Sequence, residues 1–163
     1  MASTSRPSAW RIDDAIWGEN PPTGEGAARY GGRWNSKGMP VIYTGESLAM
    51  AVLEKYVSLI FPAPPGAAFI KLMFDFNACA IADVRRESLP IDWQAVPPST
   101  ATRAIGDDWF KSGRTAILRV PSALLPEESN YLVNPAHPDF PRITLHKPTA
   151  FHFPPRLLPG GRS

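Results

Sequence analysis

Three polar side chains stand in one stretch, residues 24–54, in an order that suits a ligand containing phosphate and ribose. Arg33 follows paired glycines, which let a backbone approach a ligand closely, and a guanidinium there can fork onto phosphate oxygens. Tyr43 ends a short apolar run, where its ring can stack on a flat heterocycle. Glu54 lies in the helical segment that follows, and a carboxylate there can bond a ribose hydroxyl and stabilise positive charge at the anomeric carbon. The stretch therefore suggests chemistry on a dinucleotide.

Taken one at a time, each of these residues also fits an ordinary structural role. Arg33 suits a surface ion pair in a turn, and Tyr43 suits a core tyrosine whose hydroxyl has found a partner. Glu54 suits a solvated helix position that pairs with Lys55 or Ser58. The residues alone favour these structural roles, and the functional interpretation depends on reading the three as one unit.

Other polar residues are candidates for the same ligand. Ser47 precedes Glu54 by seven positions, which places both on one helix face. Ser122 follows a strong strand, and ligand sites gather at strand ends, although a turn or helix-cap serine is the alternative. Ser129 and Asn130 form a rival polar pair. The residues themselves do not choose between the two serines.

Composition restricts the class of protein. The chain has 163 residues, 44% of them hydrophobic and 20% charged, as expected for one soluble globular domain. The net charge of +2 is too small to indicate nucleic-acid binding. Neither a secretory signal nor an apolar run of about 20 residues is visible, so we expect no membrane span and a cytoplasmic location. The single cysteine, Cys79, agrees with a reducing compartment.

Familiar catalytic signatures are missing from the sequence. There is no Walker A motif and no GxSxG motif, and the pair of glycines at 24 and 26 is too short for a dinucleotide fingerprint. His137, His146 and His152 lack the spacing of metal ligands, so we predict no metal site.

The spacing of hydrophobic residues and the positions of glycine and proline predict an α+β fold with more strands than helices. The stripe Leu48, Val52 and Tyr56 predicts a helix that faces the core along that side. Residues 18–32 are rich in glycine and proline and predict a loop, and Asp107 is expected in the first turn of a late helix. The expected strands are residues 10–12, 41–43, 69–76, 115–120, 130–133, 142–145 and 149–153, and the expected helices are residues 47–59 and 105–112.

Two long blocks resemble the RES-domain family of bacterial toxins, which is named for an arginine, a glutamate and a serine. The first is GEGAARYGGRWNSKGMPVIYTGESLAMAVLE, and the second is IGDDWFKSGRTAILRVPSALLPEESNYLVNPAHPDF. The likeness extends over roughly residues 10–145. It implies a RES domain at residues 10–153, between a flexible N-terminal tail at 1–9 and a Pro/Gly-rich tail at 154–163.

The resemblance implies a fold similar to the diphtheria-type ADP-ribosyltransferases, with a split β-sheet core and flanking helices. It implies a toxin of a type II toxin–antitoxin system that breaks the nicotinamide–ribose bond of NAD without a metal. The ADP-ribosyl group then passes to a protein, or to water or phosphate. The expected partner is an antitoxin with an Xre-like helix-turn-helix region. A non-catalytic module that binds a nucleotide or the antitoxin is the alternative.

Residue by residue, the resemblance gives roles to this chain's own positions. Arg33 matches the arginine of GGRWN, Tyr43 the tyrosine of YTGES, and Glu54 the family glutamate. Ser122 is favoured over Ser129 as the family serine. The expected catalytic residues are Glu54, Arg33 and Tyr43, and the expected NAD-binding residues are Arg11, Arg33, Tyr43, Ser47, Ser122 and Asn130.

Overall fold

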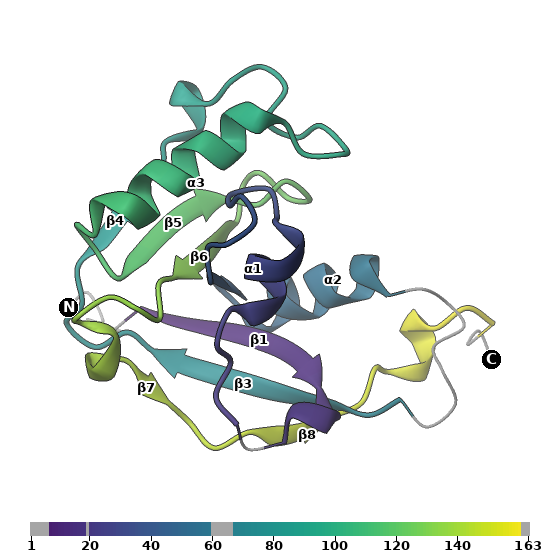
Figure 1. The fold of residues 1–163 in the computed structure, drawn as a ribbon. Helices are drawn as coiled ribbons and strands as arrows, with labels where there is room; N and C mark the ends of the chain where they lie inside the picture. The colour runs from purple at the N-terminus through teal and green to yellow at the C-terminus, as the bar shows by residue number, and fades with distance from the viewer. Residues whose placement is uncertain (1–6, 19, 60–66, 161–163) are drawn as a thin grey trace, which may run out of the picture.

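The fold is built on a curled eight-stranded β-sheet, and the helices pack beside it (Figure 1). The computed structural model describes residues 7–18, 20–59 and 67–160. Within them the strands are β1 (Ser8–Asp14), β2 (Ile42–Gly45), β3 (Phe69–Asp75), β4 (Ile81–Asp83), β5 (Ile117–Pro121), β6 (Ser129–Val133), β7 (Thr144–Leu145) and β8 (Thr149–Phe151). Their order is β4-β5-β6-β2-β1-β3-β7, and β8 also pairs with β3. The β4–β5 pair is parallel and the other pairs are antiparallel.

In the described part of the chain, three α-helices lie beside the sheet: α1 (Glu25–Tyr30), α2 (Leu48–Ser58) and α3 (Thr100–Ser112). Figure 1 shows α3 lying along β4 and β5. Short 3-10 turns are found at Ala15–Trp17, Arg86–Ser88, Phe140–Arg142 and Pro155–Leu157. In the part of the chain that the structure describes, no helix has the length and apolar character needed to cross a membrane.

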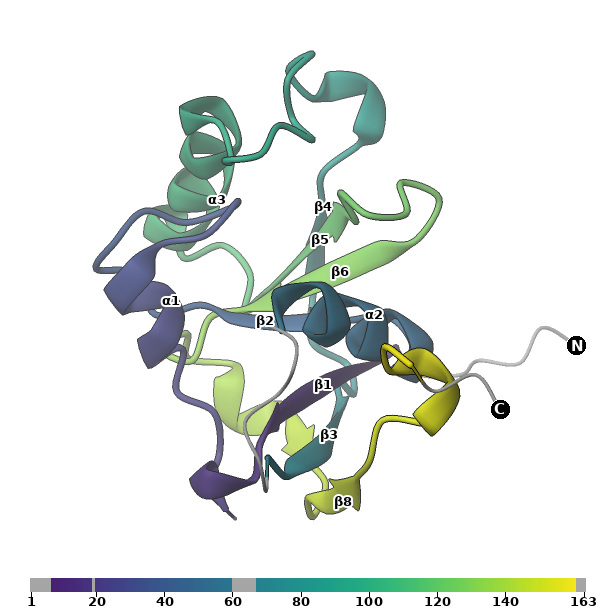
Figure 2. The ribbon, with the colours of Figure 1, turned by 90° about the vertical axis from the view of Figure 1, so that its right-hand side faces the viewer.

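The sheet has a seam between β1 and β2. Strand β1 pairs with β3 along its whole length, but with β2 it shares one residue pair, Trp10 with Gly45. The two halves of the sheet therefore diverge on either side of that pair, and Figure 2 shows β1 and β6 separating with α2 beside the gap. This seam agrees with the split sheet that the family resemblance implies.

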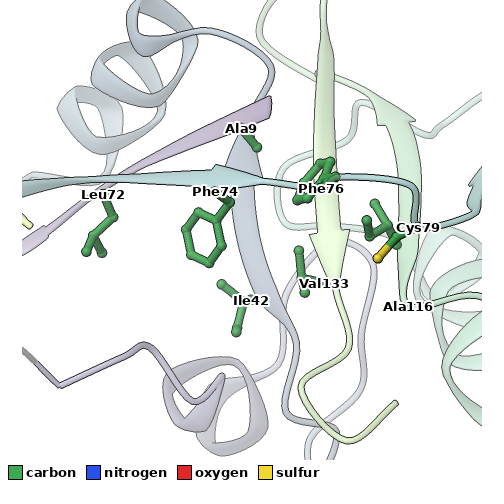
Figure 3. Packing of buried hydrophobic residues seen from close by; sticks show 9 residues of the cluster. Ala9, Ile42, Leu72, Phe74, Phe76, Cys79, Ala116 and Val133 are labelled. Carbon is green, nitrogen blue, oxygen red and sulfur yellow. The ribbon is translucent and has the colours of Figure 1, made fainter. Parts of the chain in front are cut away.

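Apolar clusters on the two faces of the sheet hold it in place. One cluster joins strands of both halves and includes Ile42, Phe74 and Val133 (Figure 3). A second lies on the opposite face, where Trp34 and Trp109 pack against strands of the β4-β5-β6-β2 half. The first cluster spans the seam, so the halves stay together although their backbones hardly pair there.

Helix α2 lies unusually close to β2, and this close approach decides which of its faces is buried. A side chain at Gly45 would meet the backbone nitrogen of Ala51 at 2.9 Å and Met50 at 3.1 Å. Met50 and Ala51 are accordingly the buried residues of the helix. The predicted stripe of Leu48, Val52 and Tyr56 is only partly buried, because these residues pack on a smaller side cluster. The face that presses on the sheet is therefore the one that carries Glu54.

Two predicted boundaries were wrong because capping signals were misread. The expected loop at 18–32 contains α1, which begins after Gly24 and ends before Gly31. Both glycines have positive φ and cap the two ends of the helix. Helix α3 begins at Thr100 rather than 105, because the Ser99 hydroxyl accepts a hydrogen bond from the Thr102 amide. Asp107 is therefore in the body of α3 and not in its first turn.

The remaining differences concern the ends of strands. Strand β4 was not predicted, since it is short and its side chains are half-buried or exposed. The expected strand at 142–145 is shortened to β7 by the preceding 3-10 turn, and the irregular tail after 153 includes another such turn. The boundaries of the two tails stay a prediction, and their residues 1–6 and 161–163 lie outside the described residues.

Gly106 tests how α3 positions the loop that contains Arg33. A side chain at Gly106 would overlap the backbone carbonyl of Trp34. We expect Gly106→Ala to lower the free energy of unfolding by about 3 kcal/mol, because backbone must move. Chemical denaturation measures this. Gly26→Ala is the matched control, since its side chain would meet nothing within 4 Å. Equal effects of the two substitutions would contradict the close approach.

Candidate functional site

A cavity of about 310 Å³ opens at the seam, between β1, β2 and α2. Its position follows from the divergence of the two strands, which leaves a gap that α2 covers from one side. The residues that line it are Trp10, Arg11, Ile12, Asp13, Tyr43, Thr44, Gly45, Ala51, Glu54, Lys55, Ser58 and Asn130. Four of the predicted site residues, Arg11, Tyr43, Glu54 and Asn130, are therefore neighbours in the fold.

Glu54 is held by the hairpin of β5 and β6. Its Oε1 accepts a 2.7 Å hydrogen bond from the Asn130 side-chain amide and a 3.3 Å hydrogen bond from the Ser122 hydroxyl. Its Oε2 bonds to none of the residues that the structure describes. The carboxylate is thus fixed through one oxygen, and Glu54 is one of the residues that line the cavity.

Ser122 is fully buried, and its hydroxyl has a defined direction. The Ser122 oxygen accepts hydrogen bonds from the backbone amides of Leu124, at 3.1 Å, and Leu125, at 3.3 Å. Because a hydroxyl has two lone pairs and one proton, these bonds leave the proton for Glu54.

Ser129, the rival serine, points to the other face of the sheet. Side chains alternate along a strand, and the next residue, Asn130, faces Glu54. The Ser129 hydroxyl instead accepts a 2.9 Å hydrogen bond from Arg119. The geometry therefore places Ser122, and not Ser129, beside the glutamate.

Arg33 lies beside this cluster and is not one of the described residues that line the cavity. Its Nη1 donates to the backbone carbonyls of Trp93, at 2.7 Å, and Ala95, at 3.0 Å. Burial lowers the pKa of Arg33, whereas the negative charge of Glu54 raises it. An arginine nevertheless stays protonated at neutral pH, so a positive charge stands close to Glu54.

Tyr43 supports the neighbouring loop with its hydroxyl. The hydroxyl donates a 2.6 Å hydrogen bond to the buried side-chain carbonyl of Asn35 and accepts one of 3.2 Å from the Trp34 amide. Burial raises the pKa of Tyr43, so the group stays neutral. The phenol is therefore occupied inside the protein, while the residue still forms part of the cavity wall.

Arg11 spans the seam where main-chain pairing stops. Its Nη1 donates a 3.0 Å hydrogen bond to the carbonyl of Tyr43 on β2. Its Nε and Nη2 form a two-point contact with Asp13, at 2.8 and 2.9 Å. Arg11 thereby links the strands across the cavity, and a carboxylate already neutralises its charge.

Among the described residues, Ser47 neither lines the cavity nor forms a hydrogen bond with Glu54. Its hydroxyl caps α2 by accepting a 3.0 Å hydrogen bond from the Met50 amide. Its predicted contact with NAD stays a prediction. Sequence reasoning also missed the carbonyls that hold Arg33, because residues 60 positions apart gave no signal of contact.

The described residues contain no group of three or more His, Cys, Asp or Glu side chains that could hold a metal ion. What the arrangement offers is a fixed carboxylate, a nearby guanidinium and an aromatic wall around a cavity. These groups suit a ligand with an anionic part and a ribose hydroxyl.

Comparison with known proteins identifies similar chains. The family model described as "RES domain" matches residues 8–155. A protein named "Prs ADP-ribosylating toxin", from Sphingobium sp. (strain YBL2), is 36% identical over 155 residues, which cover 93% of this chain and 96% of that protein. A "Toxin Res" from Yersinia enterocolitica is 36% identical over 136 residues, covering 83% of this chain and 89% of that one.

A solved structure shares the fold. A chain in the crystal structure of the M. tuberculosis MbcT–MbcA toxin–antitoxin complex superposes with a TM-score of 0.72, covering 88% of this chain and 83% of that chain. The sequences are 20% identical, so this likeness concerns the fold. It confirms the predicted single domain of mixed α and β structure.

The hydroxyl of Tyr43 tests the internal support of the site. We expect Tyr43→Phe to lower the free energy of unfolding by about 1–2 kcal/mol, because buried Asn35 and the Trp34 amide lose a partner. Thermal and urea unfolding measure the change. Tyr30→Phe is the control, since Tyr30 is 73% exposed. A Tyr43→Phe protein as stable as the control would show that these bonds contribute little.

Proposed function

This chain belongs to the RES-domain family, and we propose that it is the toxin of a toxin–antitoxin pair, an enzyme that cleaves the nicotinamide–ribose bond of NAD. The names of its relatives, an ADP-ribosylating toxin and several Res toxins, support this activity. NAD is accordingly its substrate. The non-catalytic alternative is not favoured by any feature of the cavity.

One observation carries the proposal for the site: Glu54 is fixed through one oxygen, while its other oxygen bonds to none of the residues that the structure describes. The bonds from Asn130 and Ser122 hold Oε1, so Oε2 can accept a ribose hydroxyl without first reorganising. A carboxylate whose position is set before the substrate arrives is suited to stabilising charge that develops during a reaction. A merely solvated glutamate would have no such support.

The proposed reaction needs little from the protein besides positioning. Nicotinamide in NAD carries a positive ring nitrogen, and the bond to ribose breaks with its electron pair moving onto that nitrogen. Positive charge then develops on the ribose, next to Glu54, and the carboxylate stabilises it. Arg33 contacts the diphosphate, and Tyr43 packs against a flat ring of the substrate. Ser122 and Asn130 act through Glu54 as positioning residues.

The acceptor of the ADP-ribosyl group completes the reaction. We propose transfer to a protein target, with water or phosphate as the competing acceptor, since a relative is named for ADP-ribosylation. The nucleophile attacks the anomeric carbon and loses its proton. The proposed partner is a cognate antitoxin of the Xre type that blocks the cavity, and the proposed location is the cytoplasm.

Glu54→Gln tests the reaction. The amide keeps the shape of the side chain but removes its charge, so we expect release of nicotinamide from NAD to fall by at least about a hundredfold. Chromatography of free nicotinamide measures the rate, and circular dichroism checks the fold. Glu25→Gln, at an exposed position in α1, should retain the wild-type rate. Wild-type turnover in Glu54→Gln would remove Glu54 from the mechanism.

Labelled NAD tests the acceptor. Purified protein is incubated with cell lysate and NAD radiolabelled in the adenylate part. We expect one or a few labelled protein bands with the wild type and none with Glu54→Gln. Release of nicotinamide without any labelled protein would instead assign the acceptor to water or phosphate.

The two serines give a paired prediction. Ser122→Ala removes a hydrogen bond to the Glu54 carboxylate, so we expect kcat to fall about tenfold. Ser129→Ala removes a contact with Arg119 on the opposite face, and kcat should stay within about twofold of the wild type. Both variants are compared after their folded fraction has been measured. A larger loss in Ser129→Ala would reverse the assignment.

A further inference from the structure

We propose that Lys55 is a second cation for the diphosphate of NAD, acting beside Arg33. This inference rests on the proposed function. Lys55 follows Glu54 in α2, and both residues line the cavity at the seam. Its side chain is 18% exposed, which is low for a lysine, and its charged end is therefore kept at the cavity wall rather than in bulk solvent.

The contacts of Lys55 hold its ammonium group weakly. The Nζ atom lies 3.2 Å from one carboxylate oxygen of Asp14, and the Asp14 side chain is 48% exposed. The same Nζ lies 5.5 Å from the centre of the Phe69 ring, which orients the group. Single-point pairs with a half-exposed partner contribute little to stability, so Asp14 can turn to water when another anion arrives.

Arg11, the other cation of the cavity wall, is held far more firmly. Asp13 contacts it at two points, and the Asp13 side chain is only 14% exposed. Arg11 also bonds the carbonyl of Tyr43 and links the two strands. Moving Arg11 toward a ligand would break all of these bonds, whereas moving Lys55 would break one single-point ion pair and a contact with the Phe69 ring. Lys55 is therefore the cation of the cavity that can change partners.

A phosphate group is the anion that fits this exchange. Because Glu54 and Lys55 line the same cavity, a phosphate carried by the ribose that Glu54 holds could reach the Lys55 ammonium group within that cavity. A phosphate offers several acceptor oxygens to the three N–H donors of an ammonium group, and such charge-assisted bonds are strong. The diphosphate thus displaces Asp14 from Lys55.

Substitutions of Lys55 and Asp14 test the exchange, because they should act in opposite directions. Binding of ADP-ribose, which is not consumed, is measured by calorimetry at low and high salt. We expect Lys55→Gln to weaken binding by about three- to tenfold, and Asp14→Asn to tighten it by about twofold, since it removes the competing carboxylate. Adenosine, which lacks the diphosphate, should show no such difference. Lys111→Gln, an exposed lysine at the end of α3, is the control.

The opposite effects of the two substitutions on ADP-ribose binding distinguish a ligand-binding role of Lys55 from a structural one. If the Lys55–Asp14 pair only braces the fold, either substitution breaks it, and both variants weaken ADP-ribose binding together or leave it unchanged; both results would overturn the inference. A wild-type protein that does not bind ADP-ribose would also overturn it. Wild-type release of nicotinamide, measured in parallel, shows whether the proposed function stands independently of Lys55.

Discussion

The hydrogen bonds that Asn130 and Ser122 donate to Glu54 connect one helix to one hairpin, and the site depends on that connection. They can form because Gly45 lets α2 lie directly on β2, which brings the buried face of the helix over the ends of β5 and β6. A larger residue at Gly45 would lift the helix and with it the carboxylate. Gly45 and Glu54 therefore belong to one arrangement, although Gly45 has no side chain that could react or bind a ligand.

The seam in the sheet makes room for the cavity between β1 and β2. Continuous pairing of β1 and β2 would have filled the space with backbone, whereas a single residue pair leaves a cavity of about 310 Å³. The missing main-chain bonds are replaced in part by Arg11, whose guanidinium reaches the carbonyl of Tyr43. The apolar cluster around Phe74 and Val133 continues across the seam and keeps the halves together.

Local chemistry was predictable from the sequence, and long-range pairing was not. Local patterns of glycine, proline and hydrophobic residues place Arg33 in a loop, Tyr43 in a strand and Glu54 in a helix. The bonds of Glu54 to Ser122 and Asn130 join residues 68 and 76 positions apart and depend on strand order, which no local pattern encodes. Leu48 and Val52 pack against an apolar cluster as predicted, but the fully buried positions of α2 are Met50 and Ala51, which the close approach of the helix to β2 selects. Strand β4 escaped notice because three half-exposed residues carry no alternation.

The carbonyls of Trp93 and Ala95 give Arg33 a property that the residue itself does not reveal. A free arginine side chain loses about 2 kcal/mol of rotational freedom when a ligand immobilises it. Here folding has already restricted the guanidinium, so the proposed binding of a ligand by Arg33 would cost less of this freedom. The backbone carbonyls of residues 93–95 thus determine where the Arg33 guanidinium lies. A change in the length of this segment would therefore move the Arg33 guanidinium even when every side chain that lines the cavity stays the same.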